Sequence, residues 1–573
     1  MFNRISRFLL IAGILLGMFT AKPIQHVEAL GTDRYVAKIG GVDSPTCDNP
    51  SSPCLNIGYA ILNSAASDVI HITAGAYSEH LIIDRNITLA GAGINTTIID
   101  GTSSGLVIEV QSGKNLTVSD LTIQNGNDPI NFGGGIYNLL GHLILNRVKI
   151  TNSHADAGGG IYNDGGNLDL TDVEISANSA NAYGGGILNN AGNAYLTNVT
   201  LSGNSAGVFG GGIYHQTSGT DSLTNVTISG NTAHLGGALA VEGSTTITIT
   251  NSTIAGNHID SSPFASTGGI KNFGSGITMV NSIVSQNDDK DCSLGAVLSY
   301  GNNMDGDGTC FPSFLALPSD HPSANPLLSS LAYNGGYVAT RALQLGSPAI
   351  DAADGAYCPP IDANRKTRPQ DGNGDSIPVC DIGAAEAPTL MKFLSVGAYD
   401  GWILESTATS SKGGTKNSSA STFLIGDNAA RKQYRAILHF NTAGLPATVT
   451  ISKVTLRMMK STGGSGNTST LGALLADIRK PYFGTAASLA ITDFQATASK
   501  TKIFNTFVKS GSWYSATLKS TGFAYVNRTG TTQFRVYFTK GDDHDSVADY
   551  LKFYSGSAST ANRPQLVIQY YVP

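Results

Sequence analysis

The stretch Gly133-Gly-Gly-Ile-Tyr-Asn138 decides the fold of this chain, because it returns at regular distances. It recurs at Gly158, at Gly184 as Gly-Gly-Gly-Ile-Leu-Asn and at Gly210 as Gly-Gly-Gly-Ile-Tyr-His, each time 25 or 26 residues further on. A repeat of this length is typical of a solenoid, in which each coil stacks on the one before it. Because glycine adopts positive φ without strain, we interpret the triplets as structural turns.

Between the triplets, apolar and polar residues alternate, which is the period of a β-strand. Aligning the coils puts aliphatic residues into two columns. The first column holds Val118, Leu145, Leu170, Leu196, Leu223 and Ile249, and the second holds Ile123, Ile150, Ile175, Leu201, Ile228 and Ile254. Such columns predict an all-β chain whose central part is a parallel β-helix with a core of stacked aliphatic side chains.

A column of asparagines recurs at one turn of these coils: Asn178, Asn204, Asn231, Asn257 and Asn287. Asparagine tolerates left-handed backbone at turns, so we expect this conformation in the column. Stacked copies can also pair amide to amide, as in the ladders of steric zippers. The column therefore predicts a structural ladder.

Length and composition suit a solenoid with one further domain. Of the 573 residues 68 are glycine, 13% are charged and the net charge is −6, with no cluster of Lys and Arg in the helical region. This argues against nucleic acid as a partner. The segments that we predict are 1–29 as a signal peptide, 30–115 as an N-terminal cap with the first coils, 116–324 as β-helix coils, 325–388 as a C-terminal cap and 389–573 as a β-sandwich.

The N-terminus has the pattern of a secretory signal. Arg4 and Arg7 precede an apolar run over 8–19, and Val27-Glu-Ala29 is a suitable cleavage site. No second apolar run is long enough to span a bilayer. We expect a secreted or cell-surface protein, monomeric and without a transmembrane span once the signal is removed.

The six cysteines fall into three pairs that are close in sequence. Fifteen connectivities are possible, and short loops favour the local one. We predict disulfides rather than a zinc site, because zinc-type spacing with histidine is absent. The predicted pairs are Cys47 with Cys54, Cys292 with Cys310, and Cys358 with Cys380.

Three segments resemble known families. The N-terminal segment carries an apolar helical face made by Leu55, Ile57, Ala60, Ile61 and Ala65. It resembles the N-terminal caps of secreted bacterial proteins with a right-handed, pectate-lyase-like β-helix, which implies a right-handed coil.

The segment with Asn325-Pro-Leu-Leu, Gly346-Ser-Pro-Ala-Ile-Asp351 and Cys380-Asp-Ile-Gly-Ala-Ala-Glu386 is similar to the choice-of-anchor Q segment. That resemblance implies a closing cap linked to surface attachment. Asp371, Asn373 and Asp375 within it alternate as calcium ligands do. They depart from the EF-hand pattern, so the hypothesis of bound calcium stands beside that of a solvated turn.

The last segment has short alternating strands separated by turns, which predicts a β-sandwich. Its stretches 435–446 and 553–570 resemble the DNRLRE (disaggregatase-related) jelly-roll modules, which implies a carbohydrate-binding role. Sugar rings stack on flat aromatic side chains, although aromatics in strands are more often core. The candidate ligand-binding residues are Trp402 first, then Tyr399, Trp513 and Tyr514. A loop with Asp542, Asp543, Asp545 and Asp549 is a further calcium candidate, the alternative being a solvated acidic loop.

The acids and histidines of the coils share no column, so we predict no catalytic residue. His215 is interpreted as a turn residue, Arg147 as a surface partner of Asp172, and the inserted loop 258–267 as one wall of a groove. The sequence favours an exported protein that binds polysaccharide or a cell-surface glycan, or mediates adhesion, without catalysis. The alternatives are a polysaccharide lyase or glycoside hydrolase with its site on the β-helix groove, and a spacer that displays the sandwich.

Overall fold

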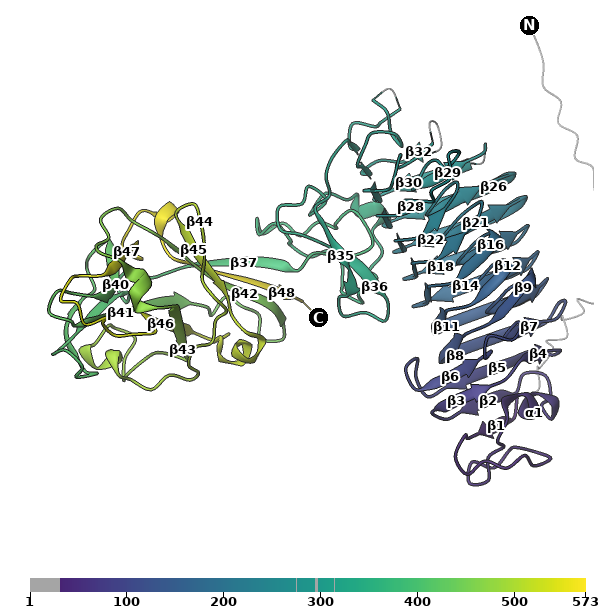
Figure 1. Ribbon diagram of the computed structural model, residues 1–573, viewed down its shortest axis with the longest axis horizontal. Coiled ribbons are helices and arrows are strands. Elements are labelled where there is room, and N and C mark those ends of the chain that lie inside the picture. Colours follow the sequence, from purple (N-terminus) through teal and green to yellow (C-terminus); the bar gives the residue numbers. More distant parts are fainter. Residues whose placement is uncertain (1–30, 275, 294–296, 314, 573) are drawn as a thin grey trace, which may run out of the picture.

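A computed structural model describes residues 31–572 except 275, 294–296 and 314. Figure 1 shows a β-helix on one side, a sandwich on the other and the 325–388 segment between them. The predicted signal peptide lies outside the described residues. Within the described ranges, no helix is both long and apolar enough to cross a bilayer.

The β-helix consists of three parallel sheets. The first sheet contains β1 (Asp33–Val36), β2 (Val69–Ile72), β3 (Gly75–Ser78), β5 (Ile87–Gly91), β6 (Thr97–Asp100), β8 (Asn115–Gln124), β11 (His142–Thr151), β14 (Asn167–Thr171), β15 (Glu174–Ser176), β18 (Asn193–Thr197), β19 (Thr200–Ser202), β22 (Ser218–Thr224), β23 (Thr227–Ser229), β26 (Ser244–Thr250), β27 (Thr253–Ala255), β30 (Gly276–Val280), β31 (Ile283–Ser285), β32 (Leu298–Ser299), β33 (Met304–Asp305) and β34 (His321–Pro322). The second sheet contains β4 (Leu81–Ile83), β7 (Ile108–Val110), β10 (Ile136–Leu139), β13 (Ile161–Asp164), β17 (Ile187–Asn190), β21 (Ile213–Gln216), β25 (Leu239–Val241) and β29 (Ile270–Asn272). The third contains β9 (Asn127–Phe132), β12 (His154–Ala157), β16 (Ser179–Tyr183), β20 (Ser205–Ala206), β24 (Thr232–Ala233) and β28 (His258–Ile259).

The predicted aliphatic columns are confirmed by the register of the first sheet. Leu145 of β11 pairs with Val118 of β8 and with Leu170 of β14. In the second column, Ile150 pairs with Ile123 and Ile175. These side chains are buried in one continuous core, where each contributes about 1.5 to 3 kcal/mol from the area removed from water.

The predicted asparagine ladder is also confirmed. The Nδ2 atom of each asparagine donates to the Oδ1 atom of the next, over 3.1 Å from Asn178 to Asn204 and 2.9 Å from Asn204 to Asn231. The expected left-handed backbone lies elsewhere: the residues before the ladder, Ala177 and Gly203, have φ of 56° and 62°. The ladder residue can therefore keep its side chain inside the turn, where the amides stack.

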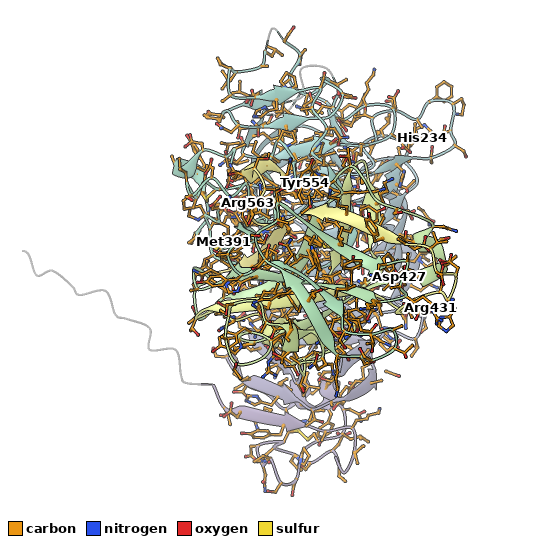
Figure 2. All side chains as sticks on the ribbon, turned by 90° about the vertical axis from the view of Figure 1, so that its left-hand side faces the viewer. His234, Met391, Asp427, Arg431, Tyr554 and Arg563 are labelled. Atoms are coloured by element: carbon orange, nitrogen blue, oxygen red, sulfur yellow. A yellow bond between two sulfur atoms is a disulfide. The ribbon has the colours of Figure 1, made fainter. Side chains whose placement is uncertain are left out.

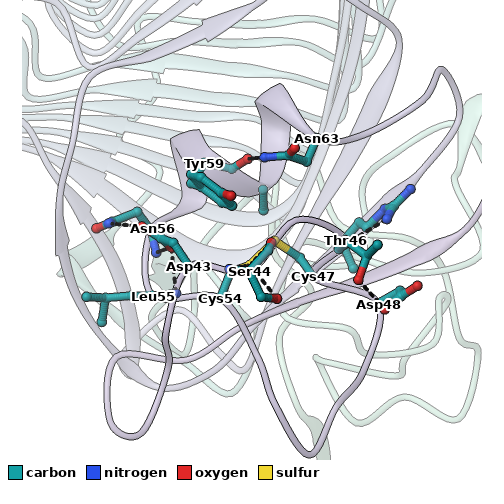
Figure 3. The surroundings of a disulfide bond; sticks show 12 residues. Asp43, Ser44, Thr46, Cys47, Asp48, Cys54, Leu55, Asn56, Tyr59 and Asn63 are labelled. Atoms are coloured by element: carbon teal, nitrogen blue, oxygen red, sulfur yellow. Dashed lines mark hydrogen bonds between the residues drawn. A yellow bond between two sulfur atoms is a disulfide. The ribbon is translucent and has the colours of Figure 1, made fainter.

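The N-terminal apolar face forms the helix α1 (Ile57–Leu62), which buries Ile57, Ala60 and Ile61 against the first coils. The carboxylate of Glu79 accepts the backbone N–H groups of Ile57 and Gly58, at 2.8 and 2.7 Å. It thus satisfies two of the free donors at the start of the helix. Figure 3 shows the adjacent disulfide.

The predicted disulfides are confirmed. The three bonds join Cys47 to Cys54, Cys292 to Cys310, and Cys358 to Cys380. All six cysteines are thereby oxidised, in agreement with the interpretation of the cysteine spacing.

The 325–388 segment lies along the flank of the β-helix, where it contacts rungs from the middle of the helix to its end. It contains the antiparallel hairpin of β35 (Leu328–Tyr333) and β36 (Ala339–Leu343). Thr200 of β19 donates to the backbone oxygen of Ala339 at 2.5 Å. Asn225 donates to the backbone oxygen of Ile361 at 2.8 Å. In Figure 1 the hairpin stands beside the β-helix, on the side that faces the sandwich.

The C-terminal part is a β-sandwich of two antiparallel sheets that share one core, as predicted. The front sheet contains β37 (Thr389–Leu394), β48 (Gln565–Tyr571), β42 (Thr450–Met459), β45 (Trp513–Thr517) and β44 (Val508–Ser510). The back sheet contains β39 (Gly413–Asn417), β38 (Gly401–Glu405), β41 (Gln433–Asn441), β40 (Thr422–Asp427), β47 (Tyr550–Tyr554), β46 (Thr531–Phe538) and β43 (Leu474–Arg479). Short 3₁₀ turns occur at Gly355–Tyr357, Thr468–Leu471, Ile491–Phe494, Ser520–Tyr525 and Thr560–Asn562.

Candidate functional site

Each glycine triplet makes the corner between the third and the second sheet of the β-helix. The first glycine of the triplet has positive φ, 74° at Gly133 and 66° at Gly158. A Cβ atom added at Gly133 would lie 2.9 Å from Cβ of Tyr137. Glycine is therefore needed both for the conformation of the corner and for the side chain that folds over it.

The corner brings the two residues that flank Gly-Gly-Gly-Ile to the outer surface. In the second sheet, Tyr137 pairs in register with Tyr162. In the third sheet, Phe132 pairs with Ala157. In the following rungs, the residues at these two positions, among them Tyr162, Tyr183 and Tyr214, pack into a cluster that is separate from the main core. Figure 1 shows β9, β12 and β16 of this region on the side of the β-helix away from the sandwich.

Seven aromatic residues of these rungs form two groups of contacting rings, which pack together with Leu188 and which we call the outer aromatic stripe. Its members are Phe132, Tyr137, Tyr162, Tyr183, Phe209, Tyr214 and Phe273. Ring centroids of neighbours are 4.8 Å apart for Phe132 and Tyr162, and 5.3 Å apart for Phe209 and Phe273. Neighbouring strands are about 4.8 Å apart, so rings on adjacent rungs are close enough to contact one another.

The stripe is open at its ends and closed in its middle. Phe132 is 46% exposed and Phe273 is 43% exposed. Tyr162 and Tyr214 are buried beneath their neighbours. The end rings are therefore the most accessible to a ligand, Tyr183 and Phe209 are half-buried, and the buried tyrosines support the row from below.

Carboxylates and an amide border the stripe. Asp164 accepts hydrogen bonds from Oη of Tyr137, at 3.4 Å, and from Nδ2 of Asn190, at 2.9 Å. The Tyr214 hydroxyl donates to Glu242. Burial, assisted by the charge of Asp164, raises the pKa of Tyr137 to about 12, so its hydroxyl remains a donor at neutral pH. Flat rings beside fixed polar groups are suited to binding sugars, which present both C–H faces and hydroxyls.

The inserted loop 258–267 rises at the far end of the stripe. Ser266 in this loop continues the column of Phe209 and Leu235. Phe264 at its tip is 81% exposed, and Asp260 pairs with His234 at 3.2 Å. Figure 2 labels His234 at the upper right, where a loop projects from the β-helix. The groove beside this loop stays a prediction.

The aromatic residues predicted in the sandwich lie in different places. Trp402 of β38 is packed against the core and meets the ring of Tyr434 edge to face. Tyr514 also packs on that core, whereas the ring of Tyr399 is tilted against that of His439, with the centroids 4.6 Å apart. Trp513 of β45 carries the Arg457 guanidinium 4.6 Å above its ring. The structure does not bring these four residues together in one site.

The predicted calcium loop at Asp371 uses its acidic oxygens to hold its own backbone. Asp371 accepts the backbone N–H groups of Gly374, Asp375 and Ser376. Asn373 accepts the N–H of Asp375 at 2.8 Å. This pattern matches the solvated-turn interpretation, and the calcium hypothesis stays untested.

Two other groups of acids lie close together. Asp543, Asp545 and Asp549 form the first, beside the edge of the sandwich where Figure 2 labels Asp427 and Arg431. The second group, at the last rungs of the β-helix, was not predicted: it consists of Asp291, Asp305 and Asp307. The carboxylates of this second group accept backbone N–H groups, including those of Cys310 and Phe311.

The predicted pairing of Arg147 with Asp172 is wrong. Arg147 instead binds Asp120 of the preceding rung at 2.6 Å. Asp172 is bound at 2.9 Å by Arg365, which the 325–388 segment brings to the flank. The expectation failed because nothing local in the sequence indicates that this segment returns to the middle rungs.

His215 is more than a turn residue. It is fully buried, and its Nδ1 atom lies 2.6 Å from Asp221, which is also buried. It ends a second ladder, in which Asn163 donates to Asn189 at 2.8 Å and Asn189 contacts the His215 ring at 3.3 Å. His215 therefore has a structural role inside the β-helix, where it contacts Asn189 and Asp221.

The outer aromatic stripe was not predicted, although its signal is present in the sequence. An aromatic residue precedes the triplet at Phe132, Tyr183 and Phe209. Another follows the isoleucine at Tyr137, Tyr162 and Tyr214. Aromatics at both flanks of a repeated corner indicate an outward-facing row.

No protein-family model matches the chain, and no curated protein sequence matches it. Among solved structures, it is similar to a pectate lyase, Pel9A, with 12% identity and a TM-score of 0.39, over 63% of this chain and 97% of the other. It is similar to a pectin methylesterase from carrot with 13% identity and a TM-score of 0.26, over 44% and 82%. A third similarity, with 10% identity and a TM-score of 0.18 over 88% and 81%, is to a tailspike protein from an Acinetobacter baumannii bacteriophage, a capsular polysaccharide depolymerase. These distant similarities carry no argument about activity.

Proposed function

We propose that this protein is exported and binds a polysaccharide along the outer aromatic stripe without cleaving it. The observation that carries the proposal is the row of rings itself, open at Phe132 and Phe273 and backed by buried tyrosines. Aromatic rings fixed by mutual packing lose little conformational freedom when a ligand stacks on them. Three disulfides support an oxidising environment outside the cytoplasm.

The polar groups beside the stripe favour binding over catalysis. Asp164 is held by Tyr137 and Asn190, and Glu242 by Tyr214. Hydrolysis of a glycosidic bond needs two carboxyl groups that face the same bond from opposite sides. Acids that are engaged by neighbouring hydroxyls and amides are instead suited to accept hydrogen bonds from sugar hydroxyls.

A glycan panel tests the proposal. The protein, immobilised as the full chain, is exposed to neutral and acidic polysaccharides with and without calcium. We expect retention of at least one polymer, with no new reducing ends and no unsaturated uronate. Retention of none would contradict binding, and release of either product would instead favour the lyase or hydrolase alternative.

A further inference from the structure

A cleft of about 670 Å³ opens between the 325–388 segment and the outer face of the front sheet. One wall is formed by Ser329 of β35 and the stretch 342–345 at the end of β36. The other wall is formed by strands of the sandwich. The residues of that wall are Lys453, Thr455, Arg457, Ser515, Val567, Gln569 and Tyr571.

The register of the front sheet explains why these side chains share one face. Lys453 of β42 pairs with Gln569 of β48, and Arg457 pairs with Gln565. Side chains two apart on a strand point to the same face, so Thr455 between the two cations also faces the cleft. The neighbouring residues Val454 and Leu456 are buried in the core on the other face.

The cleft carries positive charge in a protein whose net charge is −6. Among the residues that the structure describes, no carboxylate forms an ion pair with Lys453 or Arg457. The described residues of its lining include these two cations and no acid. A third cation, Lys366, lies 4.8 Å from the ring centroid of Tyr571 at the edge of the cleft.

Two contacts hold the guanidinium of Arg457 in a fixed orientation. Its guanidinium stacks on Trp513 at 4.6 Å, and Nη1 donates to Oε1 of Gln565 at 3.2 Å. A guanidinium fixed on one face and one edge keeps its remaining N–H groups available in a plane, the geometry in which arginine binds a carboxylate through two hydrogen bonds.

We infer that this cleft binds an acidic polysaccharide through the carboxylates of its uronate residues. Arg457 and Lys453 bind the carboxylates, and Thr455, Ser515 and Gln569 bind sugar hydroxyls. This inference does not rest on the outer aromatic stripe, because the two surfaces belong to different elements. Carboxylated glycan fits better than nucleic acid, which is tracked by longer rows of cations.

The test is titration of the full chain with oligoalginate and with its carboxyl-reduced, neutral form. We expect binding of the acidic form that weakens with salt, and no measurable binding of the neutral form at this cleft. Arg457→Gln and Lys453→Gln should each weaken binding about tenfold, the loss of one charge-assisted contact. Lys540→Gln, at an exposed position after β46, removes the same charge elsewhere and should change nothing.

Additional variants and ligands distinguish the cleft from competing binding modes. Arg457→Lys keeps the charge but loses the planar fork, and it should weaken binding less than Arg457→Gln. A double-stranded DNA oligonucleotide that competes equally for the cleft would overturn the inference, as would binding of the neutral glycan that Arg457→Gln weakens as much as it weakens binding of oligoalginate. If Phe132→Ala with Phe273→Ala abolishes oligoalginate binding while the cleft variants retain it, the cleft is not the site. Loss in the cleft variants alone leaves the stripe to be tested on neutral glycans.

Discussion

Tyr333 of the hairpin donates its phenolic hydrogen to the carboxylate of Glu174, which lies 159 residues earlier on the flank of the β-helix. Arg365 binds the neighbouring Asp172 from the same segment. The two contacts fasten the 325–388 segment to a middle rung. They therefore also fix the wall that this segment contributes to the cleft described above.

Loss of the Tyr333 contact should loosen this segment. We expect Tyr333→Phe to cost about 1 kcal/mol, because the bond is partly solvated. Limited proteolysis should cleave within 325–388 faster than in the unchanged protein. Tyr300→Phe, a change at another exposed tyrosine, is the control, and equal cleavage of the two variants would contradict the fastening role.

The asparagine ladder should contribute to stability in proportion to its burial. Asn204→Ala removes a buried amide that bonds Asn231 and accepts from Asn178, so we expect a loss of about 2 to 4 kcal/mol in the free energy of unfolding. Asn193→Ala breaks a comparable 2.9 Å bond to Asn167 in an exposed place and should cost less than about 1 kcal/mol. Denaturant unfolding measures both, and equal losses would show that burial is not the cause.

The burial of His439 leads us to expect that the free energy of unfolding of the sandwich depends on pH. Burial lowers its pKa to about 4, so the folded state resists protonation that the unfolded chain accepts near pH 6.5. The stability due to neutral His439 is present above pH 6.5 and is lost as the pH falls toward 4, by up to about 3 kcal/mol. Asp400, whose pKa is raised to about 7 by burial, gives the opposite slope: its contribution is full below pH 3.8 and declines as the pH rises through 7.

The variant His439→Gln separates these two effects, because it keeps Asp400. Relative to this variant, the unchanged protein should lose stability between pH 6.5 and pH 4 in thermal or denaturant unfolding. A stability difference that stays constant across this range would contradict the buried, neutral histidine.

The disulfide between Cys292 and Cys310 should stabilise the end of the β-helix. Both cysteines are buried in the main core beside Phe311. Changing the pair to serine should cost about 3 kcal/mol, through the larger freedom of the unfolded chain. The Cys47 to Cys54 bond closes a shorter loop, with a separation of 7 rather than 18 residues, and its removal should cost less. Unfolding at matched pH compares the two variants.

Much of the fold could be predicted because each rung of the repeat makes its contacts with the rungs next to it. Leu145 meets Val118 and Leu170 in adjacent rungs, and a fixed period places them without knowledge of the rest. The disulfides were predictable through the same locality. Contacts such as Tyr333 with Glu174 have no such period, so the flank position of the 325–388 segment could not be predicted.

The candidate site was missed for a different reason. A strand period of two identifies Ile136 as inward and Tyr137 as outward, and outward residues of a solenoid are usually solvated. Only the corner at Gly133 shows that Tyr137 and Phe132 converge with their copies in the next rung. The predicted aromatics Trp402 and Tyr514 instead pack against the sandwich core.

The most direct test of the central claim is the affinity of the full chain for its retained polysaccharide when both ends of the stripe are removed. Phe132→Ala with Phe273→Ala should weaken binding about tenfold for each ring, with the fold unchanged because both rings are half exposed. Tyr195→Ala removes a comparably exposed ring from the first sheet and should leave the affinity unaltered. Equal affinity of the stripe variant and the Tyr195 variant would contradict the proposed binding surface.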